Sequence, residues 1–471
     1  MHLMLRANGI GWNKGSDIMA GHRNVPRAYV HRKALRKRLP SSWRVQVLGN
    51  AGSSSKNRQA IGQANSETAY LSSPPLPQYR PHTFPRASHT RRELHPASMD
   101  LEPLVKVSPT KTAEEIWFEP RPKEEHDGSE YVVYLIPGNP CLISYYEPFL
   151  STLFDLLNDG ENGRTLPAHV GGYTLPGFEP DPVAQMSGIT LPASLRSQIR
   201  NTEELIEVGL DNHIHQNAAG EDACPPKVIL IAHSVGAYIA LEILRRRAKG
   251  QNGLSKVDIA GGVFICPTVV HIAQSAYGAI LNQLLRIPFF PAIVGMFVKL
   301  LAFLLPLGAL HWLIAFFGRM PPHIAQATAE FLKSPWGVHQ ALFMARDEMH
   351  EIKEDIWDEA IWGSPDAPPS ASVPLKFYFA ENDVWVPNRA RDALIASRGI
   401  STSSAALLDP WKPSMIIDDN KVPHGFIIGN LGPPPLPSQS DLPVTDHSKV
   451  VAEKVKSLIE EIIRQQNGKV I

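Results

Sequence analysis

The sequence predicts an α/β fold in which a mostly parallel central sheet carries helices on both faces. From about residue 114 onward, short β-rich apolar runs alternate with helical periods, as they do in repeated strand–helix–strand units. The chain has 471 residues, 43% of them hydrophobic, so it can bury a large core. Its 42 prolines argue against long helical repeats and coiled coils.

The individual elements follow from residue type and spacing. Strands are expected at short runs of β-branched, aliphatic and aromatic residues, in chain order 116–118, 131–136, 172–175, 227–232, 259–266 and 375–380. Helices are expected where apolar residues recur every three to four positions, at 145–158, 194–210, 235–248, 387–398 and 446–466.

Residues 1–98 differ from the rest of the chain because they lack an apolar period and hold 16 Lys and Arg against 3 Asp and Glu. We expect a disordered basic extension. A mitochondrial transit peptide has a similar composition, but no amphipathic helix of sufficient length is visible, and no apolar run suits a secretory signal. The globular core is expected at 99–267 and 371–471, interrupted by an insertion at 268–370.

Charge and cysteine content exclude several classes of function. The 46 basic residues balance 46 acidic ones, which argues against nucleic acid as the main partner. Cys141, Cys224 and Cys266 are too few and too scattered for a disulfide framework or metal cluster, which favours a reducing intracellular setting. His213 and His215 lack companion ligands, so we expect a polar loop there. With no phosphate-binding or dinucleotide motif present, neither a metal nor another cofactor is expected.

Ser234 gives the strongest chemical signal because it stands at a sharp turn between an apolar strand and a helix, in the stretch VILIAHSVGAY. In such a nucleophile elbow the serine has a strained backbone, and the residues two positions away must be small. Ala232 and Gly236 meet this requirement, although glycine is commoner at the first position. The start of the helix presents the N–H of Val235 to a developing oxyanion.

A serine hydroxyl needs a general base and an orienting carboxylate, which should follow it in the order Asp, His. Asp383 comes just after the last expected strand, where sheet-end loops collect catalytic groups. His424, between a proline and a glycine before the final helix, is the expected base. If Asp383 is only a turn residue, Glu381 or the pair Asp418 and Asp419 would supply the carboxylate.

The second oxyanion donor is expected in the loop that follows the strand at 131–136. This loop reads Pro-Gly-Asn-Pro, and the N–H of Asn139 is the expected donor. Pro140 has no N–H, so the next donor along the chain is Cys141. An ordinary tight turn is the alternative interpretation of these four residues.

Five segments together resemble the lipid droplet-associated hydrolase family, over about residues 115–465. They are LIPGNP at 135–140, YYEPF at 145–149, HSVGAY at 233–238, the stretch from FYF to Pro at 377–387, and VPH at 422–424. The resemblance implies an α/β-hydrolase fold and a serine ester hydrolase acting on sterol esters or neutral glycerolipids. It also implies a location at the lipid droplet and the endoplasmic reticulum.

By this resemblance, Ser234, Asp383 and His424 fall on the triad positions of the family. Two residues depart from its pattern, because Cys141 stands where a glycine usually follows the loop and Ala232 replaces the elbow glycine. Two other functions remain open: a non-catalytic lipid-droplet scaffold, and an acyltransferase or thioesterase that uses the same serine with another acceptor or substrate.

The insertion contains an unusually apolar stretch at 284–317, whose only formal charges are Arg286 and Lys299. Residues 300–318 carry no formal charge, and a stretch of about 19 residues is long enough to cross the hydrocarbon core of a bilayer, which is about 30 Å thick. This region is where an α/β-hydrolase carries its lid.

A simple membrane crossing does not fit the rest of the sequence. Pro306 lies within the apolar stretch and Pro288 and Pro291 just before it, which favours a kinked element. A single crossing would also place Ser234 and His424 on opposite sides of the membrane. We therefore expect a monotopic hairpin or interfacial helix pair that docks on a lipid droplet or endoplasmic reticulum membrane. A fully buried lid helix is the alternative.

Overall fold

The computed structural model describes residues 114–120, 131–158, 166–181, 189–215, 226–364, 373–400, 412–428 and 447–467. The extension expected at 1–98 lies outside these residues, as does Cys224.

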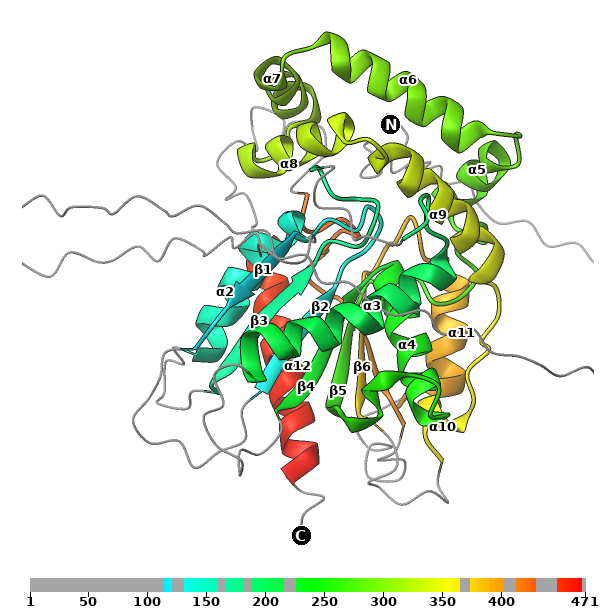
Figure 1. Cartoon of the computed structure of the whole chain (residues 1–471). Helices are drawn as coiled ribbons and strands as arrows, with labels where there is room; N and C mark the ends of the chain where they lie inside the picture. The colour runs from blue at the N-terminus through cyan, green and yellow to red at the C-terminus, as the bar shows by residue number, and fades with distance from the viewer. Residues whose placement is uncertain are drawn as a thin grey trace, which may run out of the picture. The chain divides into compact units, whose positions relative to one another are not determined.

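A seven-stranded sheet forms the centre of the structure, with the strand order β1-β3-β2-β4-β5-β6-β7 (Figure 1). Only β1 runs antiparallel to its neighbour, and the other pairs are parallel, as the sequence predicts. The strands are β1 (Glu115–Phe118), β2 (Tyr131–Ile136), β3 (Ala168–Tyr173), β4 (Lys227–His233), β5 (Asp258–Ile265), β6 (Leu375–Phe379) and β7 (Ser414–Ile417). The central strands β2 and β4 are buried along almost their whole length.

Two strands differ from the sequence expectation. The third strand covers Ala168–Tyr173 rather than 172–175, because its sequence AHVGGY contains no apolar run that marks its start. A Cβ atom on Gly171 would collide with the backbone of Ile116 and the ring of Trp117, so glycine lets β1 pack closely. The strand β7 was not predicted, since it has only four residues and its faces are partly exposed.

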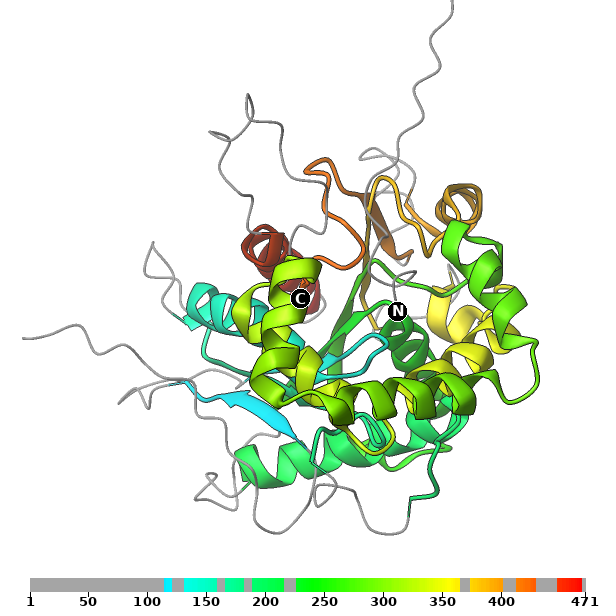
Figure 2. The same ribbon diagram turned by 90° about the horizontal axis from the view of Figure 1, so that it is seen from above.

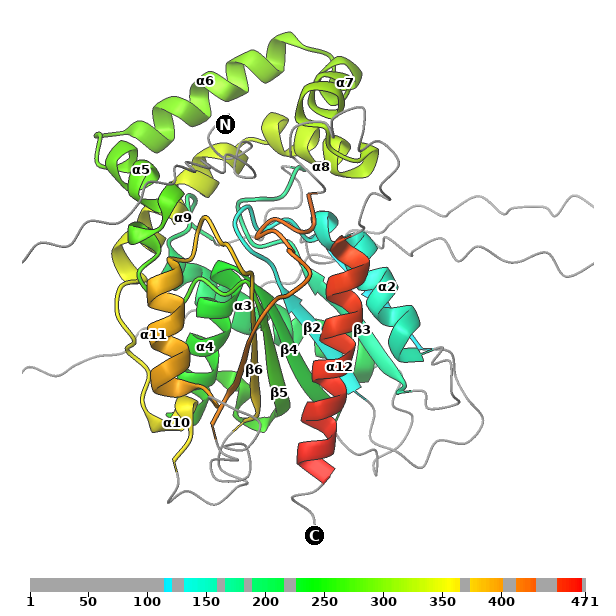
Figure 3. The same cartoon turned by 180° about the vertical axis from the view of Figure 1, so that it is seen from behind.

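Helices cover both faces of the sheet, as expected (Figures 1 and 3). The helices α2 (Glu147–Asn158) and α12 (His447–Asn467) pack against each other on one face. The helices α3 (Leu195–Leu210) and α4 (Val235–Ala248) pack together on the other. The helix α11 (Asn388–Arg398) follows β6. Each of these five helices lies within one or two residues of its predicted bounds.

Most of the described residues between β5 and β6 are helical. They form α5 (Ala276–Leu285), α6 (Phe290–Leu304), α7 (Leu307–Gly318), α8 (Pro322–Lys333), α9 (Gly337–Glu351) and the short α10 (Glu359–Trp362). The helices α5 to α9 lie beyond the edge of the sheet where the parallel strands end (Figures 1 and 2). The prolines act as expected, because Pro291 lies in the first turn of α6 and Pro306 separates α6 from α7.

The apolar helices α6 and α7 expose much of their surface. Among the described residues, all but two of the exposed large hydrophobic side chains lie between 280 and 317, the exceptions being Ile356 and Ile417. No single helix in the described part of the chain is long and apolar enough to cross a membrane. The pair α5 and α6, bent by 95°, meets the length and composition requirement only when taken together.

Candidate active site

Ser234 lies in the tight turn between β4 and α4, at the carboxyl edge of the sheet. Its backbone has φ 55° and ψ −124°, a conformation that residues other than glycine rarely adopt. A Cβ atom on Gly236 would collide with the carbonyl oxygen of Ile136 in β2, which explains why this position must be glycine. Ala232 is fully buried in β4, where it pairs with Ile136 and Phe264 of the neighbouring strands. The predicted elbow geometry is therefore present.

Ser234, His424 and Asp383 form one continuous chain of hydrogen bonds. The Oγ of Ser234 lies 2.9 Å from Nε2 of His424, and Nδ1 of His424 lies 2.7 Å from Oδ2 of Asp383. Since the carboxylate can only accept, Nδ1 carries the proton and Nε2 is free to accept from the serine. The structure thus brings together three residues that lie on three different loops of the chain.

Asp383 occupies the carboxylate position, and its side chain is only 2% exposed. Its Oδ1 accepts the backbone N–H groups of Trp385 and Val386 at 2.8 and 3.2 Å, while Oδ2 faces His424. These bonds fix the carboxylate in one orientation. The alternative Glu381 is exposed and does not take this place.

Asp418, the other alternative carboxylate, orders the turn that precedes His424. It accepts a hydrogen bond from the hydroxyl of Tyr378 and from the backbone N–H groups of Asn420 and Val422. Asp419 is exposed and accepts from the side chain of Asn420. In this structure neither aspartate takes the place of Asp383 beside the imidazole.

The loop after β2 lies against the elbow, where an oxyanion donor is needed. The N–H of Gly138 is occupied, because it donates to the hydroxyl of Tyr146 at 2.8 Å. Among the residues that the structure describes, the N–H of Asn139 has no hydrogen-bond acceptor. Val235 is the first residue of α4, where N–H groups have no partner within the helix. Both expected donors are therefore available.

The side chain of Asn139 connects this loop to α9. Its Nδ2 donates to the carbonyl of Ala341 at 3.0 Å and to the carboxyl of Glu348 at 2.8 Å. Burial raises the pKa of Glu348 to about 7, although the hydrogen bond from Asn139 opposes this shift. No sequence pattern marks Glu348, because its partner Asn139 lies 209 positions away.

We expect Glu348→Gln to become progressively more stable relative to the parent as pH rises. The folded state raises the pKa of this carboxyl above its ordinary value of 4.5, so folding favours the protonated form. As pH rises from about 4.5 to 7, the ionisation of this group therefore lowers the free energy of unfolding of the parent by up to about 3 kcal/mol. The side chain of glutamine keeps an oxygen that can accept the hydrogen bond from Asn139, and it carries no charge. Urea unfolding at pH 5 and pH 8 measures the difference.

The exposed Glu354 supplies the control for that comparison, because Glu354→Gln removes a carboxylate near the same helix without removing a buried one. A stability difference between Glu348→Gln and the parent that is equal at pH 5 and pH 8 would contradict the expectation.

Within the described residues, the Sγ of Cys266 and side-chain atoms of Asp383 and His424 lie within 4.8 Å of one another, close enough to hold a metal ion. Burial raises the pKa of the Cys266 thiol well above its ordinary value, which makes it a poor metal ligand. We therefore interpret the closeness of these three residues as a result of the hydrogen bond between Asp383 and His424, and not as a metal site.

The remaining residues that the sequence marked take no part in the hydrogen bonds between Ser234, His424 and Asp383. His213 stacks on Trp117 with ring centroids 4.5 Å apart and contacts the carboxyl of Glu115, while the side chain of His215 lies outside the described residues. Cys141 and Cys266 are free and buried.

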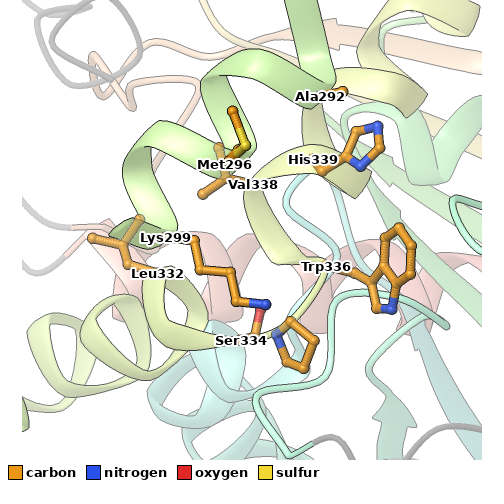
Figure 4. Close-up of a pocket in the computed structure, with 10 residues that line it drawn as sticks. Ala292, Met296, Lys299, Leu332, Ser334, Trp336, Val338 and His339 are labelled. Atoms are coloured by element: carbon orange, nitrogen blue, oxygen red, sulfur yellow. The ribbon is translucent and has the colours of Figure 1, made fainter. Parts of the chain in front are cut away.

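A pocket of about 220 Å³ lies between α6 and the segment that joins α8 to α9 (Figure 4). Lys299, the only charged residue of α6, points into this pocket toward Ser334. The residues that line it are Ala292, Gly295, Met296, Lys299, Leu332, Ser334, Pro335, Trp336, Val338 and His339. Because none of them belongs to the serine site, this pocket is separate from it.

The arrangement of strands and turns is that of the α/β-hydrolase fold, with the serine elbow after a central parallel strand, as the sequence predicts. Among solved structures, a thermophilic esterase from Thermogutta terrifontis aligns with 77% of this chain and 98% of its own, at 12% identity and a TM-score of 0.38. A monoglyceride lipase from Saccharomyces cerevisiae aligns with 76% and 96% of the two chains, at 12% identity and a TM-score of 0.39.

Sequence comparison finds relatives that share a name. A lipid droplet-associated hydrolase of Drosophila melanogaster is 26% identical over 318 residues, which cover 66% of this chain and 88% of the relative. The protein of that name from Gallus gallus is 26% identical over 270 residues, or 55% of this chain and 72% of the relative. The family model described as lipid-droplet associated hydrolase matches residues 129–427, which is more than half of the chain. The chain therefore belongs to the lipid-droplet associated hydrolase family.

Proposed function

We propose that this hydrolase is a serine ester hydrolase that acts on neutral lipid esters, either sterol esters or glycerolipids, at the surface of lipid droplets. The observation that carries the proposal is the hydrogen-bonded chain from Ser234 through His424 to Asp383. This arrangement activates a hydroxyl for attack on an ester carbonyl, and it needs no metal or organic cofactor.

In the proposed reaction, Oγ of Ser234 attacks the ester carbonyl while Nε2 of His424 takes its proton. Asp383 holds the imidazole in place and stabilises the positive charge that forms on it. The N–H groups of Val235 and Asn139 stabilise the oxyanion of the tetrahedral intermediate. The alcohol leaves with the proton from His424, and water then releases the fatty acid from the serine by the same steps.

The proposed docking surface for the lipid phase consists of the exposed apolar side chains of α6 and α7. On α6, exposed apolar side chains recur every three to four positions and form one stripe, which consists of Ile293, Phe297, Leu300 and Leu301. On α7, the exposed rings of Trp312 and Phe316 are stacked at 5.3 Å. An apolar surface of this kind is costly in water and favours a position in the lipid interface.

Several polar groups near this surface are hydrogen-bonded to the rest of the protein. At the break between α6 and α7, the carbonyls of Ala302 and Leu305 accept hydrogen bonds from Nζ of Lys333 at 2.6 and 2.7 Å. His311 of α7 lies 3.1 Å from the carbonyl of Pro322. Because unpaired backbone groups are costly in hydrocarbon, these bonds suit a broken helix pair that enters one leaflet.

The same helices reach the proposed active site through α8 and α9. The hydroxyl of Tyr145 bonds that of Thr328 in α8 at 2.8 Å, and Asn139 bonds Glu348 in α9. We propose that residues 268–370 form a lid that places the serine beside the lipid phase, with 99–267 and 371–471 as the core. The proposed location is a monotopic position on lipid droplets and the endoplasmic reticulum membrane, through residues 284–317.

Release of fatty acid from emulsified cholesteryl oleate and trioleoylglycerol by the purified full chain tests this function. Ser234→Ala is the blank, since it keeps the fold and the apolar surface. We expect release by the parent and none by the variant. Equal release by both proteins, or none by a folded parent from either substrate, would contradict the proposal.

A further inference from the structure

Tyr146 and His233 form a buried bridge between the oxyanion loop and the loop of His424. The N–H of Gly138 donates to the hydroxyl of Tyr146 at 2.8 Å, and this hydroxyl lies 2.7 Å from Nδ1 of His233. On the other side of the ring, Nε2 of His233 lies 2.8 Å from the backbone carbonyl of His424. Three consecutive hydrogen bonds therefore connect two loops that flank the serine.

The chemistry of these groups assigns the protons of the bridge when His233 is neutral. A carbonyl only accepts, so Nε2 of His233 carries a proton and donates it to His424. The N–H of Gly138 only donates, so the hydroxyl of Tyr146 accepts that bond and, with His233 neutral, donates a hydrogen bond to Nδ1 of His233. A neutral His233 with its proton on Nε2 satisfies all three bonds.

The surroundings keep both side chains neutral. Burial lowers the pKa of His233 to about 3, and the nearby imidazole of His424 adds to this shift. Burial also raises the pKa of Tyr146 well above its ordinary value. The rings of Phe426 and His233 meet edge to face with their centroids 5.2 Å apart, and His233 is buried. The bridge therefore keeps one arrangement of protons over the pH range in which a serine hydrolase works.

Gly138 shows how closely the bridge holds the oxyanion loop. A Cβ atom at this position would lie 2.8 Å from Cβ of Ser234 and 2.9 Å from Nδ1 of His233. The loop thus contacts the elbow directly, and the occupied N–H of Gly138 leaves the next one, on Asn139, to face the reacting carbonyl. On the other side, His233 donates a hydrogen bond to the backbone carbonyl of His424, the residue that carries the proposed catalytic imidazole.

We propose that Tyr146 and His233 are positioning residues, which set the oxyanion donor of the Asn139 loop and the imidazole of His424 relative to each other. This inference rests on the proposed ester hydrolysis. Donor and base must reach the same carbonyl, and misplacing either one lowers transition-state stabilisation while substrate binding is kept. The bridge therefore affects kcat more than KM.

The neighbouring Tyr145 offers a matched control. Its hydroxyl is also buried and also bonded, to Thr328 at 2.8 Å, but it takes no part in the bridge. Tyr146→Phe and Tyr145→Phe each remove one buried hydroxyl and leave the aromatic ring in place. A role limited to stability would affect the two variants alike.

The test compares kcat and KM of the parent, Tyr146→Phe, Tyr145→Phe and His233→Asn with a water-soluble p-nitrophenyl ester. We expect Tyr146→Phe and His233→Asn to lower kcat by about 10- to 100-fold, with KM changed by less than about 3-fold. Tyr145→Phe should keep kcat within about 3-fold of the parent, even if its melting temperature falls as much as that of Tyr146→Phe. Nitrogen-15 NMR of the imidazoles, assigned by the signal lost in His233→Asn, should show His233 protonated on Nε2 and not titrating between pH 5 and 9.

Equal kcat values for Tyr146→Phe and Tyr145→Phe in an active parent would overturn this inference and leave the proposed function intact. A His233 that titrates near neutral pH would also overturn it. A folded parent that neither hydrolyses esters nor reacts with a fluorophosphonate would overturn the proposed function together with this inference.

Discussion

Replacing Ser234 with alanine should lower kcat/KM for ester hydrolysis by about 10⁴-fold or more. The oxygen of this hydroxyl is the attacking atom of the proposed reaction, and it lies 2.9 Å from Nε2 of His424, the proposed base. The same loss should follow from His424→Ala, because the residues of such a chain act as one unit. Hydrolysis of p-nitrophenyl butyrate measures the effect without the complication of a lipid phase.

Ser255 provides the control for this substitution. It is an exposed serine in the turn before β5, so Ser255→Ala removes a hydroxyl without touching the proposed site. We expect this variant to retain the activity and melting temperature of the parent. Activity of Ser234→Ala within about 10-fold of the parent would show that another group attacks the ester.

Placing two charges on the apolar face of α6 should abolish binding to lipid droplets. Phe297 and Leu301 lie one turn apart in the exposed stripe. Each side chain contributes about 2 kcal/mol when it leaves water, so Phe297→Glu with Leu301→Glu should weaken binding by about 10³-fold or more. Flotation with artificial droplets of trioleoylglycerol under a phospholipid monolayer measures the bound fraction.

Ile356 supplies the matched control, since it is 53% exposed but lies outside the docking surface. Ile356→Glu should float with the droplets as the parent does. Both variants should hydrolyse p-nitrophenyl butyrate at the rate of the parent, which separates docking from chemistry. Undiminished flotation of the variant with two charges would contradict the proposed docking surface.

The sequence predicts the sheet and the serine elbow because their signals are local. The run VILIA in β4 is apolar without interruption, and the small residue Gly236 follows Ser234 at the spacing that the turn requires. The positions of Asp383 and His424 follow from chain order, since the carboxyl ends of parallel strands meet at one edge. Their mutual distances could only come from the folded chain.

Other features could not be predicted because they depend on contacts between distant segments. Glu348 lies in an amphipathic helix that resembles many others, and its role depends on a partner 209 residues away. His233 and Tyr146 stand in motifs that the sequence singled out, but the bond between them joins positions 87 residues apart. The strand β7 is recognisable only through its pairing with β6.

The central claim, that Ser234 is the nucleophile, is tested most directly by locating the adduct of a fluorophosphonate probe on the detergent-solubilised chain. Mass spectrometry of the tryptic peptide 228–245 should show one adduct on Ser234 in the parent. It should show no adduct there in His424→Ala, because the hydroxyl then lacks its base. An adduct on a different serine, or no adduct on a folded parent that hydrolyses esters, would contradict the claim.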